Sequence, residues 1–245
     1  MKTVIALTAI LATFATAGFA STIFSVTGQT DANGNSVTAS ATLSLSLVGS
    51  TEVLTVILEN DTANQTSDGE NITGLKLNLD SSVTGASYAS GTGTLIQIGS
   101  GGTVTSSAAG SALSHWTAAT SLSQLTLTTI GGGAPVDAVI GTPNGSGIYT
   151  NANGSLTGGT KQPYSQKTAT FTINLTGTNI TLSSFTGASI GFGTAGTNYI
   201  TTGPPTTSTS ATPEPGSFWL LGTGAAMISL ASQRKRFINK DTKEK

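Results

Sequence analysis

The stretch Thr168 to Leu175, with sequence TATFTINL, alternates polar and apolar residues along its whole length. Its apolar members are Ala169, Phe171, Ile173 and Leu175. Polar residues occupy the positions between them, namely Thr168, Thr170, Thr172 and Asn174. Because successive side chains of a β-strand point to opposite faces, this pattern predicts a strand with one buried face and one solvated face.

The same alternation recurs between residues 21 and 202. The apolar positions of these further strands are Leu43, Leu45 and Leu47, then Leu54, Val56 and Leu58, then Leu75, Leu77 and Leu79, and later Leu125 and Leu127. Turn sequences separate the strands, at Asn33-Gly34, Asp68-Gly69, Pro143-Asn144-Gly145 and Asn153-Gly154. No stretch of about 12 or more residues carries a helical stripe. We therefore expect an all-β fold, an antiparallel β-sandwich forming one domain over residues 21–202, with long loops at 99–112 and 141–159.

The composition agrees with strands and turns rather than helices. Only 9% of the residues are charged, against roughly 25% in an average soluble protein. Glycine is abundant at 31 residues, and the chain has no cysteine. A disulfide framework and a thiolate metal site are therefore excluded.

The charges are unevenly distributed along the chain. Residues 21–212 contain three lysines and eight acidic residues, a net charge of −5, and six of the ten basic residues lie beyond residue 233. Because no basic patch is available there to neutralise phosphates, we expect no nucleic-acid binding.

The N-terminus has the layout of a secretory signal peptide. A positive Lys2 precedes an apolar run over residues 4–17, and Gly18-Phe19-Ala20 places small residues at the −3 and −1 positions of a cleavage site. Ala15-Thr16-Ala17 offers a second site. We expect residues 1–20 to be a signal peptide; a buried N-terminal helix is the alternative.

The C-terminus has four parts in order. The linker GPPTTSTSAT at 203–212 contains two prolines and no large apolar residue. The tripeptide Pro213-Glu214-Pro215 follows, and then an apolar stretch over residues 216–232. As a helix that stretch spans about 26 Å, slightly less than a hydrocarbon core of roughly 30 Å. We expect a single C-terminal hydrophobic helix within a transmembrane segment over 213–238, with a charged cytoplasmic tail over 239–245.

The tail resembles the PEP-CTERM sorting signal of exported proteins in Gram-negative bacteria. In that family a Pro-Glu-Pro motif precedes a short hydrophobic helix and an Arg-rich end, and a membrane protease, exosortase, recognises the tripeptide. The resemblance implies that Pro213, Glu214 and Pro215 are the sorting motif and that Arg234, Lys235 and Arg236 are the stop-transfer charges, which stay cytoplasmic by the positive-inside rule. The extension over 237–245 departs from the family pattern. A simple single-pass tail anchor is the alternative.

The body of the chain is also similar to domains attached to this signal. The matching stretches are EVLTVILEN at 52–60, ITGLKLNLD at 72–80, TATFTINL at 168–175 and IGFGT at 190–194. This resemblance implies a surface protein associated with exopolysaccharide.

The sequence does not favour an enzyme. A Ser-His-Asp hydrolase requires a histidine base, and the only histidine is His115, within Ser114-His115-Trp116 and without a G-x-S-x-G nucleophile elbow. We expect no catalytic residue, and His115 to be a loop or partly buried residue. Two carboxylates could hydrolyse a glycoside, but no spacing among the eight acids supports a particular pair.

Calcium is the one candidate cofactor. The stretch ENDTANQTSDGEN at 59–71 is the densest run of oxygen ligands in the chain, and its acids Glu59, Asp61, Asp68 and Glu70 are the candidate ligands. A solvated hairpin loop is the alternative. The stretch from Asp31 to Asn35 also begins like an EF-hand, but Ser36 replaces the required glycine.

Sugar binding would use aromatic rings that stack on pyranose faces. The candidates are Trp116, Tyr149 and Tyr164, and the alternative is that these rings belong to the core.

Two functions remain open at the level of sequence. The first is a non-enzymatic surface or extracellular-matrix protein, exported by signal peptidase and the Sec machinery, held briefly in the inner membrane and then cut by an exosortase-type protease. The second is a carbohydrate-binding module that the same tail delivers to the cell surface.

Overall fold

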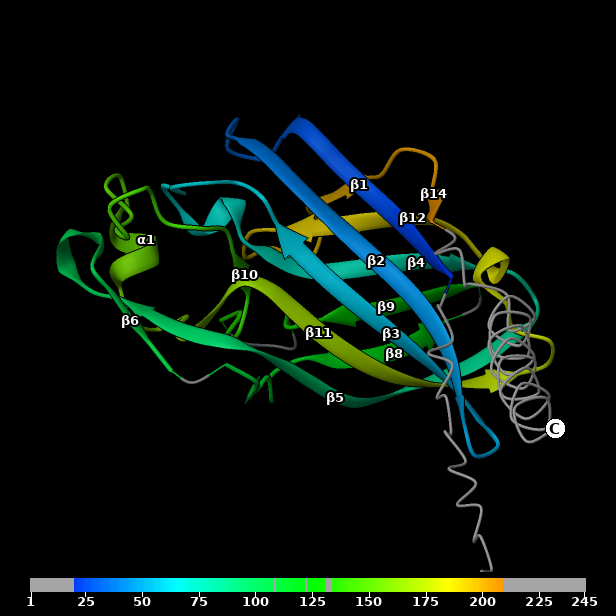
Figure 1. Cartoon of the computed structure of the whole chain (residues 1–245). Coiled ribbons are helices and arrows are strands. Elements are labelled where there is room, and N and C mark those ends of the chain that lie inside the picture. The colour runs from blue at the N-terminus through cyan, green and yellow to red at the C-terminus, as the bar shows by residue number, and fades with distance from the viewer. Residues whose placement is uncertain (1–19, 108, 122, 131–133, 209–245) are drawn as a thin grey trace, which may run out of the picture. The chain divides into compact units, whose positions relative to one another are not determined.

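The computed structural model describes residues 20–107, 109–121, 123–130 and 134–208, and nearly all of their regular structure is β-strand (Figure 1). The strands are β1 (Ser21–Thr30), β2 (Ser36–Val48), β3 (Thr51–Asn60), β4 (Ile72–Leu79), β5 (Val83–Ile98), β6 (Val104–Ser106), β7 (Ser111–Ala112), β8 (Thr117–Ser121), β9 (Gln124–Thr128), β10 (Val139–Ile140), β11 (Tyr164–Gly177), β12 (Phe185–Phe192), β13 (Tyr199–Thr201) and β14 (Thr206–Ser208). The helical turns are η1 (Asp68–Glu70), η2 (Ser100–Gly102), α1 (Gly154–Thr157) and η3 (Leu182–Ser184). The prediction of an all-β domain is confirmed.

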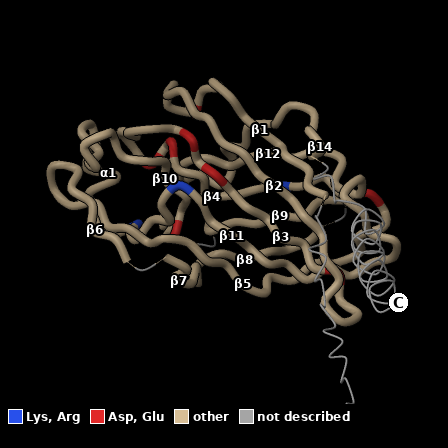
Figure 2. Tube along the Cα trace, viewed as in Figure 1, with Lys and Arg blue, Asp and Glu red and all other residues tan. Residues whose placement is uncertain are grey.

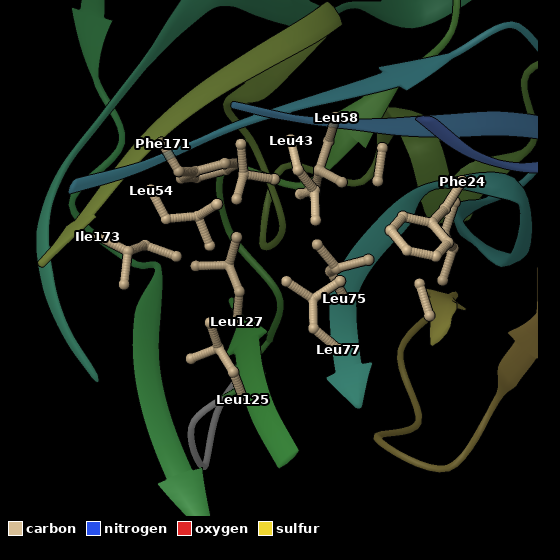
Figure 3. Close-up of a cluster of buried hydrophobic side chains, with 14 of the residues drawn as sticks. Phe24, Leu43, Leu54, Leu58, Leu75, Leu77, Leu125, Leu127, Phe171 and Ile173 are labelled. Carbon is tan, nitrogen blue, oxygen red and sulfur yellow. The ribbon is translucent and has the colours of Figure 1, made fainter. Parts of the chain in front are cut away.

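The strands lie in two layers that pack on each other (Figures 1 and 3). One layer has the order β14-β1-β2-β3-β11-β5, and the other has the order β13-β12-β4-β9-β8. The stretch that predicted the fold lies in β11, a central strand that pairs with β3 on one side and β5 on the other.

The short strand β10 connects the two layers. It pairs antiparallel with β4 through Val139 and Ile72, and parallel with β11 through Val139 and Ser165. Hydrogen bonds therefore run through all the strands as one 14-stranded mixed sheet. The expectation of a purely antiparallel arrangement is wrong at this pair, because two residues of β10 carry too little sequence pattern to reveal their direction.

The core lies between the layers. Phe171 and Leu54 from one layer face Leu75 and Leu127 from the other (Figure 3), and each of these side chains is at most 1% exposed. Burying a side chain of this size stabilises the fold by roughly 1.5–3 kcal/mol. The apolar positions of the alternating sequence therefore face the core, and the polar positions between them face away from it.

A second, smaller cluster of buried residues lies beyond the main core, next to α1. It contains Ile96 and Ile98 of β5, Ile140 of β10, Leu156 of α1 and two tyrosines. It packs under the predicted long loop over 141–159, in which the structure places one short helix.

The hairpin between β2 and β3 departs from the simple pattern. Leu47 alternates in register with buried leucines in the sequence, but Leu47 and Val48 are both 63% exposed. They lie beside the turn at Gly49, where the hairpin extends past the facing layer. Periodicity predicts which face a residue occupies, but not whether another layer covers that face.

The predicted linker begins inside the domain. Thr206 to Ser208 form β14, which pairs antiparallel with β1 from Ile23 to Ser21. All three residues of β14 are exposed. The stretch was expected to be a solvated linker because it has no apolar position, yet its backbone completes the free edge of β1.

Charged residues are sparse along the described chain (Figure 2). None of the helical segments in the described ranges is long and apolar enough to cross a membrane. The predicted signal peptide, apart from Ala20, and the transmembrane segment over 213–238 lie outside the described residues.

Candidate functional site: a polar cleft between four loops

A polar cleft of about 670 Å³ opens at the end of the domain that carries the β1–β2 turn and α1. Four segments far apart in sequence line it: the β1–β2 turn near residues 32–35, the segment 66–69 at η1, residues between 153 and 161, and the β12–β13 loop near 193–198. The strands bring these four segments together. The β1–β2 turn, the C-terminal end of β3 and the C-terminal end of β12 all lie at the same end of the β domain.

The β1–β2 turn is closed by Asp31. Its Oδ1 accepts hydrogen bonds from the backbone N–H groups of Asn33 and Asn35, each at 2.8 Å, and its Oδ2 accepts one from Nδ2 of Asn35 at 3.3 Å. Gly34 has a φ of +84°, which glycine adopts without strain. The stretch that begins like an EF-hand is therefore a turn whose carboxylate is satisfied by its own loop.

The segment around η1 forms a second closed unit. Oε2 of Glu70 accepts hydrogen bonds from the backbone N–H groups of Thr66 at 2.7 Å and Ser67 at 2.9 Å, and from the Thr66 hydroxyl at 2.9 Å. Ser67 caps η1 in return by accepting from the N–H of Gly69. This is a capping box, which fixes where the chain turns.

Asp68 is the central charged group of the cleft wall and is 4% exposed. Its Oδ2 lies 2.5 Å from Nζ of Lys161, and its Oδ1 accepts hydrogen bonds from the Tyr164 hydroxyl at 2.9 Å and from Nδ2 of Asn71 at 3.4 Å. Burial, and secondarily the Asp68 carboxylate, hold the pKa of the Tyr164 hydroxyl far above its usual value. The carboxylate and the ammonium neutralise each other within the wall.

Two glycines allow the loops to approach closely. A Cβ on Gly69 would lie 2.6 Å from Oδ2 of Asp31 and would also clash with the Asn33 amide. Gly193, with a φ of +75°, lies against Gly69 and donates a hydrogen bond to the carbonyl of Asn71 at 2.9 Å. Contact between the β1–β2 turn, η1 and the β12–β13 loop therefore depends on residues without side chains.

A smaller hollow of about 270 Å³ adjoins the cleft. It shares Ala32 and Asn198 with the larger one and is also lined by Asp31, Phe192 and Tyr199. Lys76 lies over the Tyr199 ring, 4.0 Å from its centroid, and burial raises the pKa of the Tyr199 hydroxyl. The two hollows give an extended polar surface rather than one closed pocket.

The predicted calcium ligands do not converge. Asp68 is paired with Lys161 and Glu70 is held by η1, whereas Glu59 lies at the end of β3, where its Oε1 is 3.2 Å from Nζ of Lys167. Asp61 is largely exposed. The small part of its carboxyl group that is buried, and then the nearby Glu59 carboxylate, raise the pKa of Asp61. Across the described ranges no group of three or more acidic or histidine side chains is placed to hold a metal ion.

The predicted sugar-stacking rings are buried. Trp116, Tyr149 and Tyr164 are each at most 1% exposed. Trp116 packs on Phe171 in the main core with ring centroids 4.6 Å apart, and the two tyrosines belong to the smaller cluster. The expectation that these three rings bind a sugar is wrong, because a ring without a solvated face cannot stack on a pyranose.

His115 has a partner that the sequence did not indicate. Its Nδ1 lies 2.8 Å from Oδ2 of Asp137, and the same oxygen accepts from the His115 backbone N–H at 3.3 Å. The Asp137 side chain is 3% exposed, whereas that of His115 is 54% exposed. The Asp137 carbonyl also accepts from Nε1 of Trp116 at 2.9 Å. The pair fixes the ring orientation and joins two segments, and in the described residues no hydroxyl group hydrogen-bonds to the ring.

The cleft residues Asn33, Lys161 and Asn198 are those that sequence reasoning missed. The signal in the sequence is weak: Asn33-Gly34 and Asn153-Gly154 predict turns, but nothing in the sequence indicates that these turns meet. The predicted sorting motif, Pro213 to Pro215, and the stop-transfer residues Arg234 to Arg236 lie outside the described residues.

Comparisons of the chain with known protein families, with curated proteins and with solved structures found no match.

Proposed function

We propose that this chain is an exported, non-enzymatic protein of the bacterial cell surface or extracellular matrix, sorted and cut at its C-terminal signal. The order of features in the sequence carries the proposal. A signal-peptide pattern over 1–20 precedes the β domain, and Pro213-Glu214-Pro215, an apolar segment and Arg234-Lys235-Arg236 follow it. Each feature alone is common, but their combination is typical of the PEP-CTERM proteins that the tail resembles.

The β domain is stable without disulfides and ends close to the sorting motif. The chain has no cysteine, so its stability rests on the buried apolar layers and on the hydrogen bonds of its loops rather than on disulfides. Its last described strand, β14, ends at Ser208, only a few residues before the sorting motif. A protease that acts at Pro213-Glu214-Pro215 would therefore release the whole described β domain with a short C-terminal extension.

Replacing the sorting motif tests the proposal. In the exporting bacterium, the natural chain should be found outside the inner membrane, shortened at its C-terminus. The triple variant Pro213→Ala, Glu214→Ala, Pro215→Ala should instead accumulate in the inner membrane with its C-terminal segment intact. Immunoblotting of membrane and surface fractions with tags at each end of the mature chain measures both outcomes.

The double variant Pro204→Ala, Pro205→Ala is the matched control, because it removes two prolines from the same region but leaves the motif unchanged. It should be processed like the natural chain. If the natural chain stays in the inner membrane at full length, cleavage does not occur and the segment is a simple tail anchor.

A carbohydrate-binding domain delivered to the surface is the second candidate. The polar cleft is the observation that favours it, since the aromatic rings of Trp116, Tyr149 and Tyr164 are buried and cannot stack on a sugar. The cleft volume of about 670 Å³ lies within the range of roughly 300–1,000 Å³ that is usual for ligand sites.

A further inference from the structure

Amides and hydroxyls make up most of the side chains that line the cleft. Four asparagines contribute to it, and two of them are already engaged: Asn35 donates to Asp31, and Asn153 accepts from Ser155. The side-chain amides of Asn33 and Asn198 have no hydrogen-bond partner within the described ranges. Asn33 belongs to the β1–β2 turn and Asn198 to the β12–β13 loop, so two free amides come from separate loops of one cleft.

A free amide is suited to a hydroxyl ligand. Each carries two N–H donors and a carbonyl acceptor, and a sugar hydroxyl both donates and accepts. Each amide can therefore pair with a sugar hydroxyl without leaving a buried polar group unmatched, which is what makes polar recognition selective.

The charges of the cleft exclude most ionic ligands. Its one ammonium group, on Lys161, is paired with the Asp68 carboxylate at 2.5 Å. The adjoining hollow adds Asp31, whose two oxygens accept hydrogen bonds from its own turn. A phosphate or sulfate would need unpaired Lys or Arg side chains, and the lining offers none within the described residues. An uncharged ligand therefore suits a cleft whose charged side chains are already paired.

The cleft also lacks the surface that an apolar ligand needs. Ala32 and Ala195 are the apolar side chains among the described residues that line it, and no larger apolar side chain contributes. The hollow beside it continues along Asn198 and Tyr199. The two hollows, of about 670 and 270 Å³, therefore form one continuous polar surface that shares Ala32 and Asn198.

We propose that this cleft binds a neutral oligosaccharide through hydrogen bonds from the Asn33 and Asn198 amides, with the Lys161–Asp68 pair as part of the wall. This inference rests on the second candidate function and not on the sorting signal. Binding without an aromatic platform depends on those hydrogen bonds, so removal of either amide weakens it about fivefold, and removal of both abolishes detectable binding.

Purified full-length protein, labelled for fluorescence, is applied to an array of neutral and acidic oligosaccharides and compared with Asn33→Ala, Asn198→Ala and the double variant. Asn174→Ala is the matched control, because Asn174 lies on the outward face of β11 and does not line the cleft. Thermal unfolding of every variant shows whether it is folded.

The expected result is binding to neutral oligosaccharides that Asn174→Ala leaves unchanged and that the cleft variants lose while they remain folded. An array without bound neutral glycans, or with binding that survives the double variant, overturns the inference. Selective binding to acidic glycans also overturns it. None of these results bears on cleavage at Pro213 to Pro215, so the sorting proposal stands or fails separately.

Discussion

At the scale of single residues, the site depends on Gly69. This residue lies in η1, against the β1–β2 turn on one side and Gly193 on the other. The Asp31 carboxylate that would meet a new Cβ is held by three hydrogen bonds, so it is not free to move aside. The Asn33 amide is the far end of a free side chain and can move.

We expect Gly69→Ala to separate the β1–β2 turn from η1. Forced overpacking of this kind costs about 1–3 kcal/mol, and the free energy of unfolding measured in urea should fall by that amount. Gly145→Ala is the control, because a Cβ at Gly145 meets nothing within 4 Å. Equal stability of the two variants would show that the loops do not touch in solution.

The sequence carries partial information at this scale. Asp68-Gly69 predicts a turn, and Asp68 is a candidate calcium ligand by its place in an acidic run. The pairing of Asp68 with Lys161 could not be derived, because 93 residues separate the two and neither spacing nor composition links them. For the same reason Asp137 could not be assigned to His115, 22 residues away.

At the scale of elements, β10 is held in place by a side chain from β3. Nδ2 of Asn60 donates to the carbonyl of Val139 in β10 at 2.9 Å and to that of Glu70 at 3.0 Å, while its Oδ1 accepts from the N–H of Thr62 at 3.1 Å. Asn60 is fully buried. One amide thus connects the end of β3, η1 and the strand that joins the layers.

We expect Asn60→Ala to lower the free energy of unfolding by about 1–3 kcal/mol, because the Val139 carbonyl loses its side-chain donor, whereas the Glu70 carbonyl keeps the one from Nε2 of Gln65. Asn174→Ala removes the same amide from a solvated strand face and should change stability by less than about 0.5 kcal/mol. Hydrogen exchange at β10 and β11 locates the effect. Loss of protection confined to Val48 and Thr51, at the opposite end of the β2–β3 hairpin from Asn60, would contradict this account.

Strand prediction succeeded where one face is buried and failed where both are polar. The alternation of apolar and polar residues predicts β2, β3, β4 and β11, because burial of one face imposes period two. β5 and β14 consist mainly of Gly, Ala, Ser and Thr, and they are defined by backbone pairing to β11 and β1. Backbone pairing leaves no trace in side-chain polarity.

At the scale of the whole molecule, buried tyrosines make the fold sensitive to alkali. Burial raises the pKa values of Tyr149 and Tyr164 well above the ordinary value near 10. The unfolded chain therefore loses these protons at lower pH than the folded chain does. The stabilisation is complete below about pH 10 and declines as the pH rises further, because the unfolded state then binds fewer protons than the native state.

Tyr164→Phe should reduce the slope of that decline, since one ionisable hydroxyl is gone. At neutral pH the same variant should be less stable by about 1–3 kcal/mol, because Oδ1 of Asp68 loses its hydroxyl donor. Urea unfolding between neutral and alkaline pH measures both effects. An alkaline slope identical to that of the natural chain would show that Tyr164 ionises freely in the fold.

The sequence by itself determined that this protein is a cysteine-free, sparsely charged β protein, and it predicts an export signal and a sorting signal at the two ends. Those properties are local, because alternation, composition and short motifs depend only on residues that are neighbours in the sequence. The tertiary structure decided that the predicted sugar-binding rings are core residues, that Thr206 to Ser208 complete a sheet edge, and that four turns meet at one polar cleft. Each of these depends on which distant segments pack together, and that is settled by the burial of two whole layers rather than by any single stretch of chain.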